Sequence, residues 1–482
     1  MPNPSPRFHR RGFLAAASAA LAGCAREPRP NVVVILTDDQ RWDCLSVAGH
    51  PFLRTPHLDR IAREGVRFSN AFVTTSLCSP SRASYLSGLY AHTHGVGDNF
   101  TEYPAGLASY PRLLQAAGYR TAYIGKWHMG EQNDNPRPGF DYWASHKGQG
   151  KYNDTEFNIN GRRQVLAGYY THRVTELAVD WLRRARNPFL LILGHKAPHG
   201  IWVPEPRYAH AFDAVPIQRP ATAADTGPGK PEWIRQRVRT WHGIDGPLYG
   251  TNDYGTFVRT YLETILSVDD SAGAVYEALR AAGELDNTLL FFASDNGFLL
   301  GEHGAIDKRC MYEESIRVPM LVRYPALIPT PRVVGEMVLN VDLAPSIVDI
   351  CNAGPLPGVH GVSWKNLVRG DARRWRRSWY YEYNYEKEFP YTPNVRGVRT
   401  DGWKYMHSPT APGQPDSGKA ELYDLAADPG ETRNRIGDPG AARRLAALRA
   451  ELERLQRATG ALPDRMPPNP VIGTGLPEQS IR

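Results

Sequence analysis

The chain has 482 residues, of which 41% are hydrophobic and 22% are charged, and its formal net charge is +7. This length exceeds that of one small domain and suits one large α/β domain with a smaller domain attached. The mild basic excess is compatible with an anionic substrate. No basic run is interleaved with aromatic residues, so we expect no nucleic-acid partner.

Residues 1–24 have the pattern of a bacterial export signal. Residues 9–14 (HRRGFL) form a twin-arginine pattern, and the apolar stretch 13–22 that follows is too short to span a bilayer. Residues 21–24 (LAGC) resemble a lipobox, in which Cys24 would carry a lipid anchor; the alternative is a plain cleaved signal. We therefore expect the twin-arginine export machinery as a partner. The expected location is the periplasm, or a membrane anchor on the outer side of the inner or outer membrane.

Four apolar runs, each followed directly by polar side chains, organise the next part of the chain. Three of them are continuous rather than alternating, which is typical of strands buried on both faces of a parallel sheet. Helix-like segments lie between them, and this alternation predicts a doubly wound α/β domain over residues 25–370. The runs are 31–36, 119–124, 189–193 and 288–293, and the helix-like segments are 56–64, 81–88, 110–117, 171–185 and 257–282.

Two further regions have a different character. Residues 200–256 are rich in proline and glycine and predict a long excursion over the ligand site. Residues 371–482 predict a smaller antiparallel sheet with one helix, because short strand-like segments precede a stretch with leucines at helical spacing. The predicted strands are 378–385, 394–400, 403–407 and 420–425, and the predicted helix is 441–456.

The segment Cys78-Ser79-Pro80-Ser81-Arg82 predicts the start of a helix. Proline is tolerated in a first helical turn, and Arg82 follows Cys78 by four residues, so both side chains can face one side. The free backbone N–H groups of a helix start attract anions. A cysteine and an arginine in this setting suit a reaction on an oxyanion such as sulfate or phosphate. The alternative is an ordinary buried cysteine near a helix cap.

Two acidic clusters follow predicted strands. Asp38 and Asp39 follow the first run, and Asp295 and Asn296 follow the last. In a doubly wound sheet, ligands bind beyond the carboxyl ends of the strands, where all these side chains would meet. Four oxygen ligands suit Ca²⁺ or Mg²⁺ rather than a soft metal. The alternative for either pair alone is a loop acid that caps a helix.

Cationic and titratable side chains follow the other two strands. Lys126 and His128 are two residues apart, so in an extended backbone they would lie on one side. His199 follows the third run, and Lys308 lies downstream of the fourth. Lysine can hold an oxyanion, and histidine can transfer a proton near neutral pH. A surface salt bridge or a satisfied histidine is the alternative for each of them alone.

These motifs, in this order, resemble the type I sulfatases of the alkaline-phosphatase superfamily, from about residue 31 to the C-terminal sheet. The resemblance implies that a formylglycine-generating enzyme oxidises Cys78 to formylglycine, which acts as the nucleophile on the sulfate ester. It also implies that Arg82 stabilises the modified residue. His303 is a further candidate for binding the sulfate or moving protons. The resemblance implies Ca²⁺, in preference to Mg²⁺, held by Asp38, Asp39, Asp295, Asn296 and an oxygen of modified Cys78. The groups that it implies bind sulfate or move protons are Lys126, His128, His199 and Lys308.

The implied activity is that of a sulfuric ester hydrolase acting on a sulfated glycan or a small sulfate ester. Residues 196–202 (KAPHGIW) resemble the corresponding stretch of N-acetylglucosamine-6-sulfatases. Trp202, Trp379 and Tyr383 could stack on sugar faces, or pack in the core. An arylsulfatase, a phosphoester or phosphonate hydrolase, and a non-catalytic glycan-binding lipoprotein remain as alternatives.

The chain has five cysteines. If Cys24 is acylated and Cys78 is oxidised, only Cys44, Cys310 and Cys351 remain. At most one disulfide can then form, and its pairing is not defined by the sequence.

Overall fold

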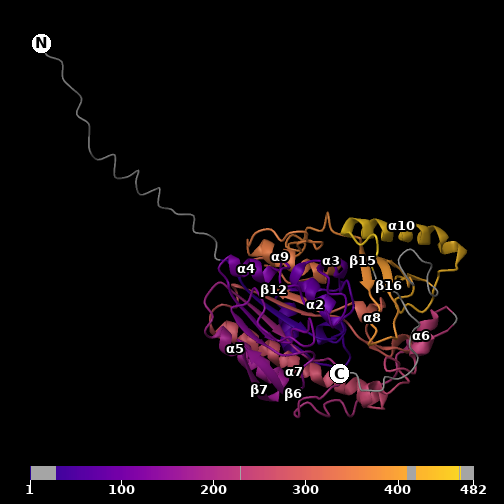
Figure 1. Ribbon diagram of the computed structural model, residues 1–482, viewed down its shortest axis with the longest axis horizontal. Helices are drawn as coiled ribbons and strands as arrows, with labels where there is room; N and C mark the ends of the chain where they lie inside the picture. Colours follow the sequence, from indigo (N-terminus) through magenta and orange to yellow (C-terminus); the bar gives the residue numbers. More distant parts are fainter. Residues whose placement is uncertain (2–28, 228, 410–419, 466, 468–482) are drawn as a thin grey trace.

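The computed structural model describes residues 1, 29–227, 229–409, 420–465 and 467 (Figure 1). The predicted export signal therefore lies outside the described residues except for Met1. No helix within the described ranges is long and apolar enough to cross a membrane.

The centre of the molecule is a ten-stranded mixed sheet. Its central strands are parallel, and antiparallel pairs occur towards both edges. The strands, in their order across the sheet, are β13 (Arg332–Val334), β2 (Val66–Phe68), β12 (Met320–Arg323), β9 (Thr288–Ser294), β1 (Asn31–Thr37), β8 (Phe189–Gly194), β4 (Arg120–Gly125), β5 (Tyr142–Ser145), β6 (Asn153–Ile159) and β7 (Arg162–Tyr169).

Strand β1 explains why the central runs are continuously apolar. Its side chains point alternately to the two faces of the sheet. Val32 and Val34 belong to one hydrophobic core, and Val33 and Ile35 belong to the core on the opposite face. Both faces are covered by helices, so no position in the strand favours a polar residue. The predicted doubly wound α/β architecture is confirmed.

The helices that cover the two faces were largely predicted within a few residues of their observed ends. Figure 1 shows α4 and α9 above the sheet and α5 and α7 below it. The first core contains residues of α2 (Cys78–Ser87), α4 (Tyr110–Ala116) and α9 (Leu343–Ile350), and the second contains residues of α1 (Pro56–Arg63), α5 (Tyr170–Leu182) and α7 (Tyr254–Ala281). The short helices are α3 (Ala91–His94), α6 (Glu232–Arg237) and α8 (Glu313–Ile316). Two small strand pairs complete this part: β14 (Val338–Leu339) with β3 (Ala71–Phe72), and β10 (Leu299–Leu300) with β11 (Ile306–Asp307).

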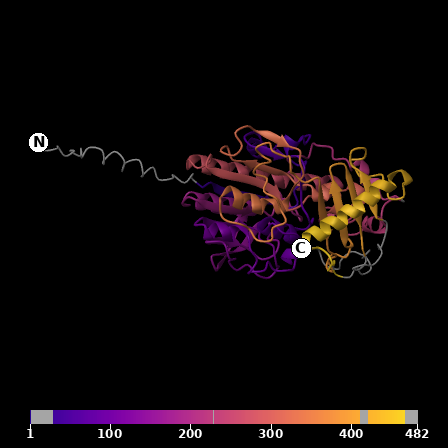
Figure 2. The ribbon, with the colours of Figure 1, turned by 90° about the horizontal axis from the view of Figure 1, so that it is seen from above.

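The C-terminal part is a four-stranded antiparallel sheet crossed by a long helix, as predicted, and Figure 2 shows the helix lying over the strands. Tyr380 packs towards the helix with Leu448 and Leu452, while Trp379 and Tyr381 pack towards the main body. The domain boundary predicted between residues 370 and 371 stays a prediction. The elements are β15 (Ser378–Tyr383), β16 (Val395–Thr400), β17 (Trp403–His407), β18 (Glu421–Asp424) and α10 (Ala442–Thr459).

The structure answers two questions about individual side chains that the sequence left open. Trp202, Trp379 and Tyr383 are 6%, 1% and 0% exposed, so they pack in the core and none of them offers a stacking face to a sugar. The four described cysteines, including Cys44, Cys310 and Cys351, are buried and free, so they form no disulfide with one another.

Candidate active site

The four predicted polar clusters meet at one edge of the large sheet. Strands β9, β1, β8 and β4 are neighbours in this order and run parallel, so their carboxyl ends lie side by side. Thr37 pairs with Ser294, and Gly125 pairs with Gly194, each pair being at or next to the last residues of its strands. The residues that follow these strands therefore share one site.

Cys78 occupies the first turn of α2 and points into this site. Its side chain is fully buried, and Sγ lies 3.3 Å from Oδ1 of Asp38, to which the thiol donates. The helix begins at Cys78, three residues before the predicted start, because Leu77 is extended and acts as the N-cap. Burial, followed by the charge of Asp38, raises the pKa of the Cys78 thiol well above its usual range. An unmodified thiol here would stay protonated and be a weak nucleophile.

The carboxylates form one cluster with this sulfur. Ligand atoms of Asp38, Asp39, Cys78 and Asp295 all lie within 4.8 Å of one another. Asn296 donates from Nδ2 to Oδ1 of Asp39 at 2.5 Å, while its own Oδ1 is buried without a hydrogen-bond partner among the described residues.

The electrostatics of this cluster favour a cation. Burial, together with neighbouring carboxylates, raises the pKa of Asp39 to about 7 and that of Asp295 to about 6. The orphaned Oδ1 of Asn296 and three clustered carboxylates fit a hard divalent cation, which would satisfy the amide oxygen and relieve the repulsion.

Three buried cations hold the carboxylates in place. Arg82 donates from Nε to Oδ2 of Asp295 at 2.7 Å and from one terminal nitrogen to the backbone oxygen of Lys126 at 2.6 Å. Lys126 pairs with Asp38, and Lys308 donates to both oxygens of Asp39 at 2.5 and 2.7 Å. Burial would raise the pKa of Asp38, but the charges of Lys126, His199 and Arg82 hold it well below its usual range.

The histidines differ in how they face the cluster. A ring nitrogen of His199 lies within 4.8 Å of both the Cys78 sulfur and an oxygen of Asp38. His128 Nε2 is bound to Glu131 at 3.0 Å, and its Nδ1 is buried without a partner among the described residues. His303 stacks on Tyr312, and its Nδ1 bonds to Asp225 at 2.9 Å. These contacts give His303 a structural role. His199 therefore faces the sulfur.

The loop after β4 is not extended, which corrects the reasoning used for Lys126 and His128. Gly125 has φ +105° and His128 has φ 49°, so the chain turns sharply at both ends of this short segment. A Cβ on Gly125 would lie 1.9 Å from the carbonyl oxygen of Gly194, so only glycine fits there. Asp39, with φ 68°, and Asp307, with φ 81°, are also left-handed. Such backbone conformations cluster at active sites.

Several supporting residues were not predicted. Gln149 accepts from Lys126, and Glu131 holds His128; both lie in loops without a recognisable pattern. Arg237, in the excursion 200–256, donates to the carbonyl oxygens of Ile306 and Lys308 at 2.6 and 3.1 Å. Lys196 is buried over the ring of Tyr152, and burial lowers its pKa to about 7. Lys196 lies in the stretch 196–202 that was already marked in the sequence, but no role had been assigned to it.

The fold and the site together define an enzyme that acts on an anionic ester. Residues 30–353 match the sulfatase family, and residues 301–458 match the N-sulphoglucosamine sulphohydrolase C-terminal family. The chain therefore belongs to the sulfatase family and is a sulfuric ester hydrolase. This confirms the predicted class and sets aside the non-catalytic alternative, while the roles of individual site residues stay predictions.

Individual relatives match over long stretches. The chain is 32% identical to the N-acetylglucosamine-6-O-sulfatase of Bacteroides thetaiotaomicron, with 92% of this chain and 90% of that protein covered. It is 33% identical to the human N-acetylglucosamine-6-sulfatase, with 74% of this chain and 68% of that protein covered. A solved structure of a protein in complex with its substrate, D-glucosamine-2-N,6-O-disulfate, matches with a TM-score of 0.84 and 31% identity over 91% of this chain and 100% of the other.

Proposed function

We propose that the chain removes the 6-O-sulfate from a glucosamine or N-acetylglucosamine residue of a sulfated glycan. The observation that carries this proposal is the similarity, over nine tenths of the chain, to an N-acetylglucosamine-6-O-sulfatase and to a structure that binds a 6-O-sulfated glucosamine. The resemblance of residues 196–202 to N-acetylglucosamine-6-sulfatases supports it from the sequence.

We further propose that Cys78 is converted to formylglycine by a formylglycine-generating enzyme and that Ca²⁺, in preference to Mg²⁺, is the metal. The hydrated aldehyde would supply an oxygen nucleophile, and a cation held beside it would lower the pKa of that oxygen and offset charge on the sulfate. Conversion of Cys78 is supported by its full burial beside Asp38, which raises the pKa of the thiol, so that the unmodified side chain would be a weak nucleophile. The residues that would hold the metal are Asp38, Asp39, Asp295, Asn296 and modified Cys78.

The remaining groups would act on the sulfate and on the proton. Lys126 and Lys308 keep positive charge beside the carboxylates, where the nonbridging oxygens of a sulfate would gather. Arg82 orients Asp295 and the loop after β4 through its two hydrogen bonds. His199 would protonate the leaving sugar oxygen, because its ring faces the Cys78 sulfur whereas His128 Nε2 is bound to Glu131.

The twin-arginine pattern of residues 9–14 supports export of the folded chain, after Cys78 has been oxidised in the cytoplasm, and the LAGC stretch supports a lipid anchor at Cys24. Export by a route for unfolded chains should then give inactive protein. Topology fusions to each route, followed by sulfate-release assays, test this part.

Release of inorganic sulfate from N-acetylglucosamine 6-sulfate tests the substrate. N-acetylgalactosamine 6-sulfate is the matched control, because it carries the same ester on a sugar that differs only in stereochemistry at C4. An aryl sulfate, and a sulfate and a phosphate ester of one common leaving group, test the arylsulfatase and phosphohydrolase alternatives. We expect the glucosamine ester to be the preferred sulfated sugar and sulfate to be preferred over phosphate. Equal turnover of both sugars, or preference for phosphate, would contradict the proposal.

A further inference from the structure

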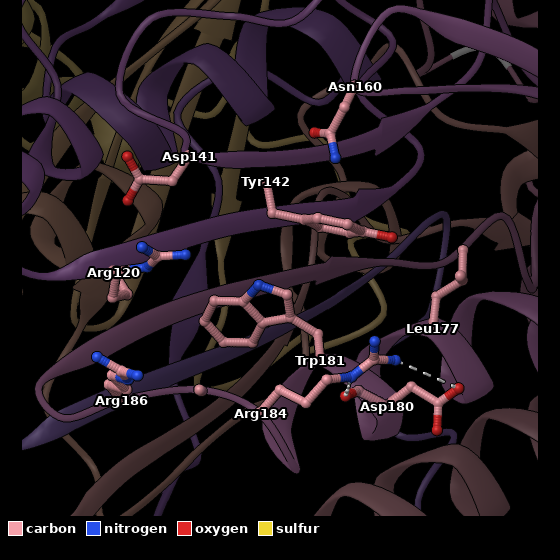
Figure 3. Close-up of a pocket in the computed structure, with 10 residues that line it drawn as sticks. Arg120, Asp141, Tyr142, Asn160, Leu177, Asp180, Trp181, Arg184 and Arg186 are labelled. Atoms are coloured by element: carbon pink, nitrogen blue, oxygen red, sulfur yellow. Dashed lines mark hydrogen bonds and ion pairs between the residues drawn. The ribbon is translucent and has the colours of Figure 1, made fainter.

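A second hollow lies at the opposite edge of the large sheet from the active site. It has a volume of about 660 Å³ and lies where β4 and β5 begin and α5 ends (Figure 3). Arg120, the first residue of β4, lines it, whereas Lys126 follows the last residue of the same strand. Six residues of strand separate the two, which corresponds to about 20 Å. The hollow is therefore separate from the catalytic cluster.

Two guanidinium groups in this hollow lack acceptors. Arg120 and Arg186 are exposed, and within the described part of the chain neither side chain forms a hydrogen bond or an ion pair. Figure 3 shows them on the same side of the Trp181 ring. The nearby Asp141 is already engaged, since its carboxylate accepts from the backbone of Thr121 at 2.9 Å and from Gln115 at 2.7 Å. Two cations that line the same hollow are thus free to bind anionic groups.

The other wall is aromatic and has unused polar groups. Tyr142 and Trp181 are half-buried, and the edge-to-face contact of Trp181 with Phe189 at 5.8 Å fixes the plane of the indole. The Tyr142 hydroxyl has no hydrogen bond to a described residue. Asn160 accepts from the backbone of Trp143 through Oδ1 at 2.8 Å, which leaves its amide N–H groups available. Rigid rings beside free N–H donors suit a sugar, whose faces are apolar and whose rim is polar.

We propose that this hollow is an accessory binding site for a sulfated sugar unit of the glycan on which the enzyme acts. Arginine forks match the oxygens of a sulfate group, and Tyr142 and Trp181 offer surfaces for the sugar ring. The inference rests on the proposed function, because it takes the ligand to be a sulfated glycan. A second contact about 20 Å or more from the catalytic site would raise the affinity for long chains without affecting single sugars.

The test uses the full chain with Cys78→Ala, so that the probe is not consumed. Binding of a heparin octasaccharide is measured by calorimetry with and without the pair Arg120→Ala and Arg186→Ala. The matched control removes two exposed arginines of other elements, Arg369→Ala with Arg443→Ala, and so changes the net charge equally. We expect the substitutions of Arg120 and Arg186 to weaken binding about tenfold, and the control substitutions to weaken it less than twofold. An unsulfated octasaccharide of the same backbone should bind poorly to every variant.

Hydrolysis separates this inference from the proposed function. With Cys78 intact, the variant that carries Arg120→Ala and Arg186→Ala should release sulfate from N-acetylglucosamine 6-sulfate as fast as the unsubstituted chain. Its kcat/KM on the octasaccharide should be lower. Equal weakening by both arginine pairs, or equal binding of a single-stranded oligonucleotide of the same charge, would mean general electrostatic attraction and would overturn the accessory site. Absence of any sulfate release by the unsubstituted chain would overturn the proposed function. The binding comparison would still test whether the hollow binds a sulfated sugar.

Discussion

Lys308 Nζ lies 2.5 and 2.7 Å from the two carboxylate oxygens of Asp39, and both side chains are buried. The charge of Lys308 is the largest influence that lowers the pKa of Asp39, against burial and three neighbouring carboxylates that raise it to about 7. One lysine thus keeps a proposed metal ligand available in its charged form.

Substitution of this lysine should affect catalysis strongly. Lys308→Met should raise the pKa of Asp39, so the acidic limb of the pH profile of kcat/KM should move to higher pH. We expect kcat/KM at neutral pH to fall about a hundredfold, because a cation beside the reacting sulfate is also lost. Lys365→Met, at a partly exposed ion pair with Asp349, is the control and should change little. An unchanged profile in Lys308→Met would contradict the role given to this residue.

Replacement of the proposed nucleophile should separate folding from activity. Cys78→Ala should abolish sulfate release, because alanine cannot be converted to an aldehyde, while calcium binding persists through the carboxylates. Cys310→Ala, at another buried free cysteine, should keep most of the activity. Mass spectrometry of the peptide that contains Cys78 should show a loss of about 18 Da in the active protein. Near-normal turnover by Cys78→Ala would reject the mechanism.

Removal of the metal should be reversible and specific. Treatment with a chelator should abolish sulfate release, and Ca²⁺ should restore more activity than Mg²⁺. Asn296→Leu removes the orphaned amide oxygen, so its affinity for Ca²⁺, measured by calorimetry, should fall roughly tenfold or more. Asn340→Ala is the control, because this buried amide bonds to Thr74 and Ser81 instead and should affect stability alone. Equal Ca²⁺ affinity in the two variants would exclude Asn296 as a ligand.

His92 should make the stability of the C-terminal part depend on pH. It bonds to Glu382 on β15 at 2.9 Å and to the backbone oxygen of Thr459 at the end of α10 at 2.9 Å. Burial alone would lower the pKa of His92, but Glu382 raises it. Burial would raise the pKa of Glu382, but His92 lowers it to about 2. The imidazolium therefore stabilises the fold at mildly acidic pH, and this contribution is lost as pH rises through the raised pKa of His92.

The measurement for this pair is thermal unfolding at two pH values. His92→Gln should destabilise the chain by about 1 kcal/mol at pH 6 and by less at pH 9. His210→Gln, at an exposed pair with Asp213, should have little effect at either pH. A destabilisation by His92→Gln that is the same at both pH values would mean that only packing was lost.

The sequence was informative where local pattern and tertiary structure agree. The strand before Asp295 was predicted because burial on both faces leaves its residues 289–293 continuously apolar. Strand β7 was missed because most of its residues, including Arg162 and Val165, are exposed at the edge of the sheet, so no periodicity marks it. Arg237 and Gln149 act through contacts with residues distant in the chain, and no local pattern reports such contacts. The contact of His199 with the sulfur likewise depends on how β8 and α2 are arranged in space.

Strand β1 has a consequence for engineering of this enzyme. Five of its seven residues, 32–36, contribute to the two hydrophobic cores, and the strand ends directly before Asp38 and Asp39. Insertion or deletion of one residue within β1 would exchange its two faces and also shift both carboxylates away from Cys78. Attempts to broaden the substrate range should therefore leave this strand intact and vary the loop residues between 200 and 256, where changes in length do not disturb the sheet register.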